Sequence, residues 1–174
     1  MIARILLRSA AALLLAAPLA VCATPDLVNA SYDVSKDGLY VATVQESFEK
    51  KGIRYQIVSE SAPAGLLAMF IRTRITIRSN GAVTAAGLRP EQYEYGRLDD
   101  ANQNVSAAFD WGSGQLRMSF DGNGATAPLV PGIQDRLSVM YQFMFLPVKQ
   151  MREIAFHMTN GKKIESYRYE FSGS

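Results

Sequence analysis

The sequence predicts a mainly β protein, in which an antiparallel meander forms a barrel or a strongly curved open sheet with one main helix packed in or across it. Three observations predict this fold class. Apolar and polar residues alternate along most of the chain after residue 26. Turn signals interrupt the alternation roughly every 8 to 12 residues. A single stretch, 131–145, instead has the 3.6-residue spacing of an amphipathic helix.

The alternating segments predict roughly nine or ten strands joined by short connections. The segments with this pattern are 27–35, 39–50, 53–57, 70–78, 83–86, 92–98, 105–111, 115–120, 151–158 and 164–171. About 150 residues follow the first 23, which is enough for one domain with a buried core. We therefore expect 24–174 to form a single β-rich domain.

Glycine, asparagine and proline mark the expected turns. Residues 36–38 and 51–52 end in glycine and close two hairpins, because glycine adopts positive φ at low cost. The Asn-Gly pair at 80–81 is the strongest short hairpin signal, so we expect a turn there. Residues 87–90 are expected to form a corner, and 61–67 a bend with a helical turn at 66–69.

The main helix is expected at about 132–145, and Pro147 stops it. Its apolar face consists of Ile133, Leu137, Met140, Tyr141 and Met144. A polar stripe beside that face consists of Gln134, Asp135, Ser138 and Gln142. Because further apolar residues extend beyond one face, we expect the helix to be covered on two sides, as a plug in the sheet rather than a lid over it.

The first 23 residues have the three parts of a secretory signal peptide. Arg4 and Arg8 precede an apolar run at 10–19, and Val21 and Ala23 provide small residues at the −3 and −1 sites. We expect cleavage after this segment and export through a bacterial inner membrane to the periplasm. The apolar run is shorter than the roughly 20 residues of a spanning helix, and no later segment is long and apolar enough, so no transmembrane segment is expected.

Cys22 is the single cysteine, and cleavage after Ala23 would remove it. The mature chain would then have no disulfide, thiolate ligand or cysteine nucleophile. The alternative is that 19–22 form a lipobox, with Cys22 acylated and the protein anchored as a lipoprotein. Val21 disfavours this alternative, because a lipobox normally has Gly, Ala or Ser at that position.

The charge balance gives no support to a nucleic-acid partner. The chain has 18 basic and 16 acidic residues, and the leader holds two of the basic residues and none of the acidic ones. The remainder is therefore formally neutral. A nucleic-acid surface needs an excess of basic residues that can replace counterions, so no nucleic-acid binding is expected.

Four sequence blocks together resemble a known family. They are Ser-Asn-Gly at 79–81, GLRPEQY at 87–93, FDW at 109–111, and GIQDRLS at 132–138 followed by Tyr141. In this order and spacing they resemble DUF3108, an exported bacterial family of unknown function, over roughly 32–171. The resemblance implies an envelope protein with a β-rich, barrel-like fold and no established activity. By a looser analogy of fold, it is similar to periplasmic lipoprotein carriers.

The resemblance also implies that the chain departs from its family at the C-terminus. Family members usually continue for several strands past the segment equivalent to 164–171. We therefore expect this chain to be a fragment or a natural truncation. An edge strand and part of the cover over the helix would then be missing.

Asp135, Ser138 and Tyr141 are candidate ligand-lining or structural residues on the helix. Asp135 would lie in the first helical turn, where its negative charge meets the positive end of the helix dipole. The favoured interpretation is that Asp135 and Ser138 tie the helix to the surrounding strands, because buried polar groups must be paired. The alternative is that they line the mouth of a cavity.

Further candidates lie on the expected strands: Trp111, Asp110 and Tyr93, the last with its neighbour Tyr95. Trp111 with Asp110 is expected to anchor a corner of the sheet. The alternative is that an exposed Trp111, or the aromatic pair Tyr93 and Tyr95, stacks on a sugar ring or an acyl chain.

No recognisable catalytic constellation is present. His157 is the single histidine, and without cysteine a metal centre would depend on carboxylates, so we expect no metal and no cofactor. Glu91 and Glu94 could be imagined as a glycosidase pair, but on a strand they point to opposite faces. The sequence also lacks a nucleophile elbow, a phosphate loop and a dinucleotide fingerprint.

The abundance of Ile, Leu, Met, Phe and Tyr favours a non-enzymatic exported protein. It would bind a small apolar or amphiphilic ligand such as a lipid, or serve envelope assembly. The second hypothesis is a scaffold that presents a sheet edge to an envelope protein partner. The third is an enzyme that processes glycan or lipid through carboxylates.

Overall fold

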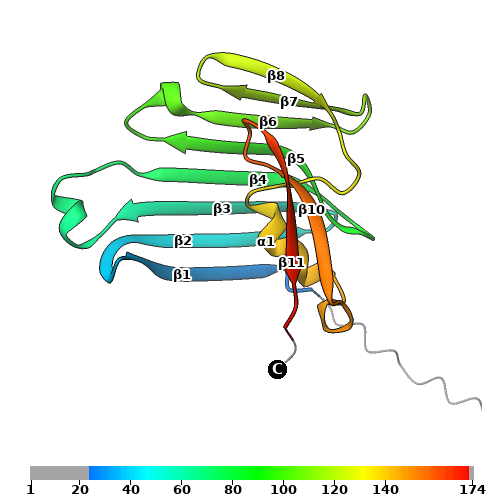
Figure 1. The fold of residues 1–174 in the computed structure, drawn as a ribbon, viewed down its shortest axis with the longest axis horizontal. Helices are drawn as coiled ribbons and strands as arrows, with labels where there is room; N and C mark the ends of the chain where they lie inside the picture. Colours follow the sequence, from blue (N-terminus) through cyan, green and yellow to red (C-terminus); the bar gives the residue numbers. More distant parts are fainter. Residues whose placement is uncertain (1–23, 173–174) are drawn as a thin grey trace, which may run out of the picture.

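The computed structural model describes residues 24–172 and contains an eight-stranded antiparallel sheet, in which each strand pairs with the next one in the chain (Figure 1). The strands are β1 (Leu27–Lys36), β2 (Leu39–Lys51), β3 (Arg54–Pro63), β4 (Ile75–Thr84), β5 (Gly87–Arg97), β6 (Val105–Asp110), β7 (Gln115–Phe120) and β8 (Asn123–Pro128). Within the described chain β1 and β8 do not pair, so the sheet is open and the closed-barrel form of the prediction is not found. The predicted leader and Cys22 lie outside the described residues.

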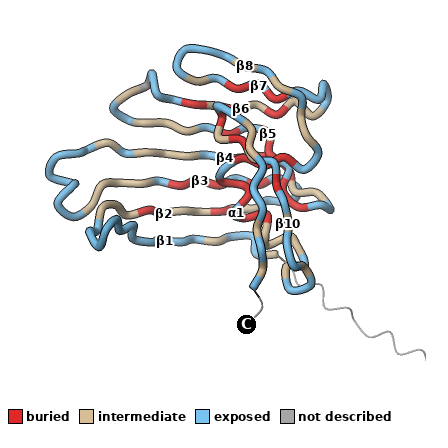
Figure 2. The backbone as a smooth tube through the Cα atoms, viewed as in Figure 1, coloured by how far each residue is buried: buried red, intermediate tan, exposed pale blue. Residues whose placement is uncertain are grey.

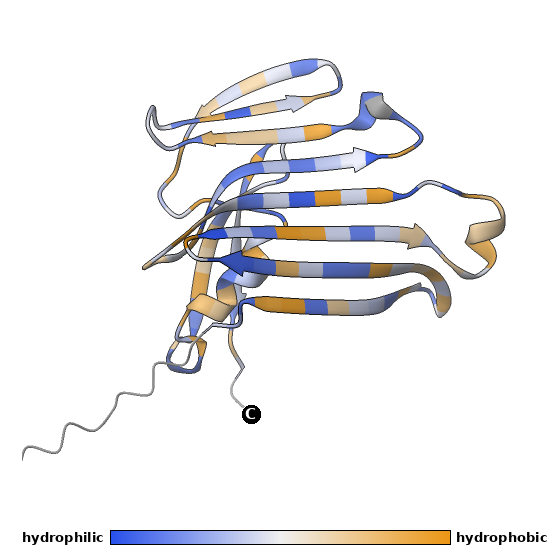
Figure 3. Ribbon diagram, turned by 180° about the vertical axis from the view of Figure 1, so that it is seen from behind, coloured by the Kyte–Doolittle hydropathy of each residue, from blue (hydrophilic) through white to orange (hydrophobic). Residues whose placement is uncertain are grey.

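A second layer packs on one face of this sheet. It consists of β9 (Gln134–Asp135), α1 (Ser138–Gln142), the 3-10 helices η3 (Phe143–Phe145) and η4 (Val148–Gln150), β10 (Glu153–Thr159) and β11 (Ile164–Glu170). β10 pairs with β9 in parallel and with β11 antiparallel. We call this layer the cover, and the sheet face beneath it the inner face. The β10–β11 hairpin crosses the strands over one half of the sheet in Figure 1, and Figure 3 shows the sheet from the opposite side.

Strand alternation separates an apolar inner face from a polar outer face, as the sequence predicts. One row of directly paired residues crosses the middle of the inner face, and we call it the core row. Its members are Val28, Phe48, Ile57, Ser79, Tyr93, Ala107, Met118 and Ala125. Leu137 and Tyr141 of the cover pack on Phe48 and Ile57, and Ile133 packs in the neighbouring cluster around Tyr93. Figure 2 shows the buried residues concentrated beneath the cover.

The main helix is much shorter than predicted. The expected helix at 132–145 is wrong in its first half, because Gly132 has a φ of +72° and Gln134–Asp135 form β9. The Asp135 carboxylate accepts hydrogen bonds from the backbone N–H groups of Leu137 and Ser138, both at 2.8 Å. These are groups that the start of a helix leaves unsatisfied, so the helical turns begin only there. α1 then continues into η3.

The Asn80-Gly81 turn and the corner at 87–90 are also wrong. β4 continues to Thr84, and Gly81 pairs with Pro90 beside a β-bulge. A Cβ on Gly81 would lie 2.9 Å from Pro90 Cα and 2.9 Å from Tyr55 Cε1, so glycine is required for close approach of the strands. The predicted turns at 36–38 and 51–52 are confirmed, and the predicted helical turn is η1 (Gly65–Met69).

Candidate functional site

Asp135 is the centre of a buried hydrogen-bond network between the cover and the sheet. Its side chain is fully buried. Ser79 Oγ of the core row donates to Asp135 Oδ2 at 2.6 Å, and the Tyr55 hydroxyl lies 3.1 Å from the same Ser79 Oγ. The other carboxylate oxygen, Oδ1, accepts the backbone N–H groups of Leu137 and Ser138, so both oxygens of Asp135 have hydrogen-bond partners. The network therefore fixes the cover over the one polar position of the core row.

Burial changes the acid-base properties of this network. Loss of solvation raises the pKa of Asp135 above its ordinary value, and the hydrogen bonds from Ser79, Ser138 and Leu137 oppose this increase. Burial also raises the pKa of Tyr55, and the nearby Asp135 charge adds to that increase. Among the buried polar side chains of residues 24–172, Asp135 is the one acid.

The remaining polar residues of the predicted stripe attach the cover to β5. Gln142 Oε1 accepts the Leu88 N–H at 2.7 Å, and Gln142 Nε2 donates to the Ala86 carbonyl at 2.8 Å. Gln134 Nε2 donates to the Leu88 carbonyl at 2.9 Å. Ser138 Oγ accepts the Asp135 N–H at 3.0 Å. The stripe is thus buried against the sheet and does not face solvent.

Tyr141 lies at the border of the cover. Its ring stacks on Phe48 with the centroids 5.1 Å apart, and its hydroxyl donates to Glu46 Oε1 at 2.8 Å. Burial and Glu46 both raise the pKa of Tyr141. The Tyr32 hydroxyl of β1 donates to the other oxygen of Glu46 at 3.5 Å. Glu46 therefore connects α1 to the edge strand of the sheet.

Trp111 and Asp110 lie at the β6–β7 turn, in a different part of the fold from Asp135. Trp111 Nε1 donates to the Pro90 carbonyl at 2.6 Å, and the Arg89 guanidinium lies 5.9 Å from the centre of the indole ring. Asp110 Oδ1 accepts the Ser113 N–H at 3.0 Å, and this bond holds the pKa of Asp110 below its ordinary value. The pair closes the turn and joins it to β5.

Tyr93 and Tyr95 lie two residues apart on the inner face of β5. Tyr93 is buried, which raises its pKa to about 12, while Tyr95 is half-buried. Together with Val105 they line a depression of about 510 Å³ at the boundary of the cover. Its other lining residues come from the cover and from two loops: Gln103, Asp121, Arg136, Asn160 and Lys162. The volume is within the roughly 300–1,000 Å³ range of small-molecule sites.

The sequence interpretation missed Arg136, Asn160 and Lys162 at this depression. Arg136 is exposed, and Lys162 Nζ lies 3.0 Å from Asp121 Oδ2. Arg136 follows β9 directly, and both residues of β9, Gln134 and Asp135, are buried. Strand alternation therefore gave no signal for Arg136, whose exposure depends on how the chain leaves β9. Two cationic side chains therefore lie beside an aromatic floor.

The inner face continues beyond the cover. The cross-strand row next to the core row, here called the border row, contains Ala30, Glu46, Ser59, Ile77, Tyr95 and Val105. The following row, here called the open row, contains Tyr32, Val44, Ser61, Ile75 and Arg97. Tyr32 is exposed, and Ile75 and Ile77 are half-buried. Part of the apolar inner face thus remains accessible.

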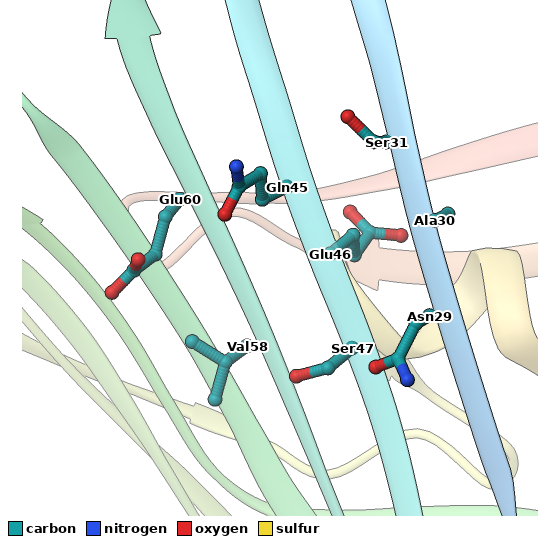
Figure 4. Close-up of a pocket in the computed structure, with 8 residues that line it drawn as sticks. All are labelled: Asn29, Ala30, Ser31, Gln45, Glu46, Ser47, Val58 and Glu60. Atoms are coloured by element: carbon teal, nitrogen blue, oxygen red, sulfur yellow. The ribbon is translucent and has the colours of Figure 1, made fainter.

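The outer face carries a depression of a different kind (Figure 4). It measures about 430 Å³ and lies over β1, β2 and β3. Its lining is mainly polar, with Val58 as the largest apolar side chain.

The acidic residues considered for catalysis do not meet in a cleft. Glu91 is held by Arg54 through two hydrogen bonds of 2.8 Å, and Glu94 is exposed on the outer face. In residues 24–172 there is no group of three or more His, Cys, Asp or Glu side chains placed to hold a metal ion. The same residues contain no helix with the length and apolar character needed to cross a membrane.

Comparison with known proteins gives one family. No curated protein and no solved structure matches the chain. The model of the family described as a protein of unknown function, DUF3108, matches residues 31–174. This match covers most of the chain and includes the four sequence blocks described above. The chain therefore belongs to the DUF3108 family, whose function is unknown.

Proposed function

We propose that this protein is exported to the periplasm and there binds an amphiphilic molecule, such as a lipid, on the inner face of its sheet. The observation that carries the proposal is the incomplete cover. The cover packs over the middle of the core row, whereas Tyr95 at the depression and Ile75 in the adjoining open row are only half-buried, and Tyr32 in the same row is exposed. Export itself rests on the signal-peptide pattern of residues 1–23.

The floor of the inner face suits an acyl chain. Ile77 and Tyr95 are direct partners in the border row, and Val105 pairs with Tyr95 on its other side. Ile75 follows in the open row. Each apolar Å² that a ligand removes from water contributes about 25 cal/mol. A chain lying along this floor would therefore gain binding energy without any change in the sheet.

The cover side of the same depression suits an anionic or polar head group. Arg136 presents an exposed guanidinium, which binds carboxylate or phosphate with two parallel hydrogen bonds. Lys162 is engaged by Asp121, so Arg136 is the better candidate for the head group. A cation beside an aromatic and aliphatic floor is the arrangement that an anionic amphiphile requires.

Replacing Arg136 with alanine is expected to weaken binding of a fluorescently labelled long-chain fatty acid by about tenfold, the effect of losing one charge-assisted hydrogen-bonded pair. Binding of the corresponding long-chain alcohol should change little. Titration of both probes into the purified protein measures the two dissociation constants. Tyr95→Ala is expected to weaken both probes, because it removes part of the floor.

Arg152→Ala is the matched control, since Arg152 is also exposed and lies away from the depression. It should leave both dissociation constants unchanged. The proposal is wrong if the wild-type protein binds neither probe and native mass spectrometry shows the bare chain after purification from a membrane-containing lysate.

A second candidate function rests on β1. This ten-residue strand is paired on one side by β2 and has no partner on its other side within residues 24–172. An unpaired edge can accept a strand from another protein through backbone hydrogen bonds. A scaffold that presents β1 to an envelope protein is the alternative. Cross-linking from β1 in cells, with no partner recovered, would count against it.

A further inference from the structure

We propose that the loop between β3 and β4, residues 64–74, is a membrane-contacting loop that inserts apolar side chains into an anionic lipid surface. The proposal extends the amphiphile-binding function and rests on it only for the idea that the bilayer supplies the ligand. The physical basis of the loop proposal is separate, because none of the loop residues 64–74 lines the depression beside Tyr95.

The loop has the densest group of exposed large apolar side chains in the described chain. Five of the six residues at 66–71 are of this kind: Leu66 (72% exposed), Leu67 (39%), Met69 (74%), Phe70 (82%) and Ile71 (44%). Single exposed apolar residues are ordinary on protein surfaces, but contiguous groups mark interaction sites. None of the five belongs to the two core clusters.

The loop backbone holds these side chains outward. Ile71 N donates to the Leu67 carbonyl at 2.8 Å, which closes the turn of η1 on itself. Ala64 N donates to the Val41 carbonyl at 3.0 Å and anchors the loop to β2. A Cβ on Gly65 would lie 2.6 Å from the Tyr40 carbonyl oxygen, so the loop base is also packed closely. The apolar side chains are thus displayed on an anchored turn.

The same end of the sheet adds further apolar surface. Leu39 is 63% exposed at the β1–β2 turn, and Leu98 is 81% exposed after β5. Leu98 N donates to the Arg74 carbonyl at 3.1 Å, so this residue lies directly beside the loop. In Figure 1 these connections lie at the end of the sheet away from the cover. The apolar surface therefore gathers at one end of the molecule.

Charge favours a bilayer with anionic lipids as the occupant. The loop contains two arginines and no acidic residue, and the adjoining carboxylate of Asp99 is engaged by Arg97 and by the Thr73 hydroxyl. Arg72 and Arg74 are both exposed, and neither takes part in a salt bridge among residues 24–172. Apolar side chains that enter the acyl boundary and arginines that remain at the head groups are the composition of interfacial membrane segments.

The size of the loop argues against a second copy of the chain. A stable protein interface buries about 800 Å² on each partner over roughly 20 or more residues. The loop offers six consecutive residues on one turn. Insertion into lipid needs no complementary partner surface, because each apolar side chain gains its transfer free energy independently.

Flotation of the purified protein with vesicles tests the proposal. The wild-type protein is expected to float with vesicles of phosphatidylethanolamine and phosphatidylglycerol. The double variant Leu66→Ser with Phe70→Ser should reduce the partition coefficient by about tenfold or more, because two large apolar side chains no longer transfer from water into lipid. Both residues are mostly exposed, so the fold should be unaffected.

Ile53→Ser is the matched control, because Ile53 is 73% exposed but lies in the β2–β3 turn at the opposite end of β3. It should float like the wild type. Arg72→Gln with Arg74→Gln should lose about fivefold per arginine on phosphatidylglycerol vesicles and little on phosphatidylcholine vesicles.

Three results would overturn the proposal. The first is that the wild type fails to float with the vesicles. The second is that the double variant Leu66→Ser with Phe70→Ser floats like the wild type. The third is that light scattering shows the wild type as a dimer and the double variant as a monomer. The fatty-acid titration, performed without vesicles, separates the two proposals. Loss of flotation in a variant that still binds fatty acid supports the loop proposal, whereas flotation of a wild type that binds no fatty acid rejects only the amphiphile site.

Discussion

Replacing Asp135 with alanine is expected to lower the free energy of unfolding by about 3–5 kcal/mol, the largest effect of any single substitution considered for this chain. The change leaves the N–H groups of Leu137 and Ser138 and the Ser79 hydroxyl without their partner. Each unsatisfied buried group costs about 1–3 kcal/mol. Urea unfolding followed by circular dichroism measures the loss.

Asp135→Asn is the informative companion variant and is expected to cost only about 1 kcal/mol. Its amide oxygen accepts the same two backbone N–H groups. Its NH₂ group donates to Ser79 Oγ, which can in turn donate to Tyr55, because either hydroxyl of that pair is able to be the donor. Asparagine thus keeps the acceptor and one donor of a protonated carboxyl group, and its second amide N–H, which has no partner here, accounts for the expected cost.

The difference in unfolding free energy between the wild type and Asp135→Asn, measured as a function of pH, gives an independent test. The pKa of Asp135 in the folded protein is raised above its ordinary value of 3.8. As pH rises from that value, the unfolded chain loses this proton first, so the unfolded state is favoured. The stability of the wild type relative to Asp135→Asn should therefore be greatest at low pH and fall until pH passes the folded pKa.

Asp33→Ala is the control, because Asp33 is exposed on β1 and should change stability by less than about 0.5 kcal/mol. Equal losses for Asp135→Ala and Asp33→Ala would contradict the network. A wild-type advantage over Asp135→Asn that grows with rising pH would contradict the raised pKa.

Replacing Gly81 with alanine is expected to lower the free energy of unfolding by about 2–3 kcal/mol, through overpacking. The new methyl group would meet the Arg89 carbonyl, Pro90 Cα and the Tyr55 ring at less than ordinary contact distance. Two of these are backbone atoms, which cannot rotate away. β4 and β5 would have to separate beside Ser79, so the Asp135 network should weaken as well. Thermal unfolding measures the combined loss.

Gly96→Ala is the matched control for this steric argument. Gly96 lies on β5 of the same sheet, and the nearest atom to its added Cβ would be 3.6 Å away, an ordinary contact. The substitution should change stability by about 0.5 kcal/mol or less. If Gly81→Ala were as stable as Gly96→Ala, close approach of the strands would not be the reason for glycine at position 81.

Features that depend on contacts within one element or one turn were predictable from the sequence, whereas features that depend on contacts between distant elements were not. Residues 39–50 and 105–111 alternate, and they form β2 and β6, because alternation reflects which side chains one strand buries. The local turns at 36–38 and 51–52 follow from glycine conformation and were predicted for the same reason. The family was also predictable, since ordered sequence blocks identify it without any structure.

The residues at 79–81 show where local signals fail. Asn-Gly favours a hairpin, but the packing of Gly81 against β3 and β5 keeps the chain extended. Ser79 is thereby brought into the core row, where it meets Asp135, 56 residues further along the chain. Neither residue alone indicates this contact, because the hydrogen bond exists only once β9 crosses the sheet.

The sequence by itself determined that the protein is mainly β, the faces of strands such as β2 and β6, the family, and the candidates Asp135, Ser138 and Tyr141. Only the tertiary structure decided that the sheet is open, that the helix begins at Ser138, and that Arg136 joins Tyr93 and Tyr95 at one depression. The physical reason is that periodicity records burial within one element. How far a cover extends over a sheet, and which apolar residues it leaves exposed at 66–71, depends on contacts between elements distant in the chain.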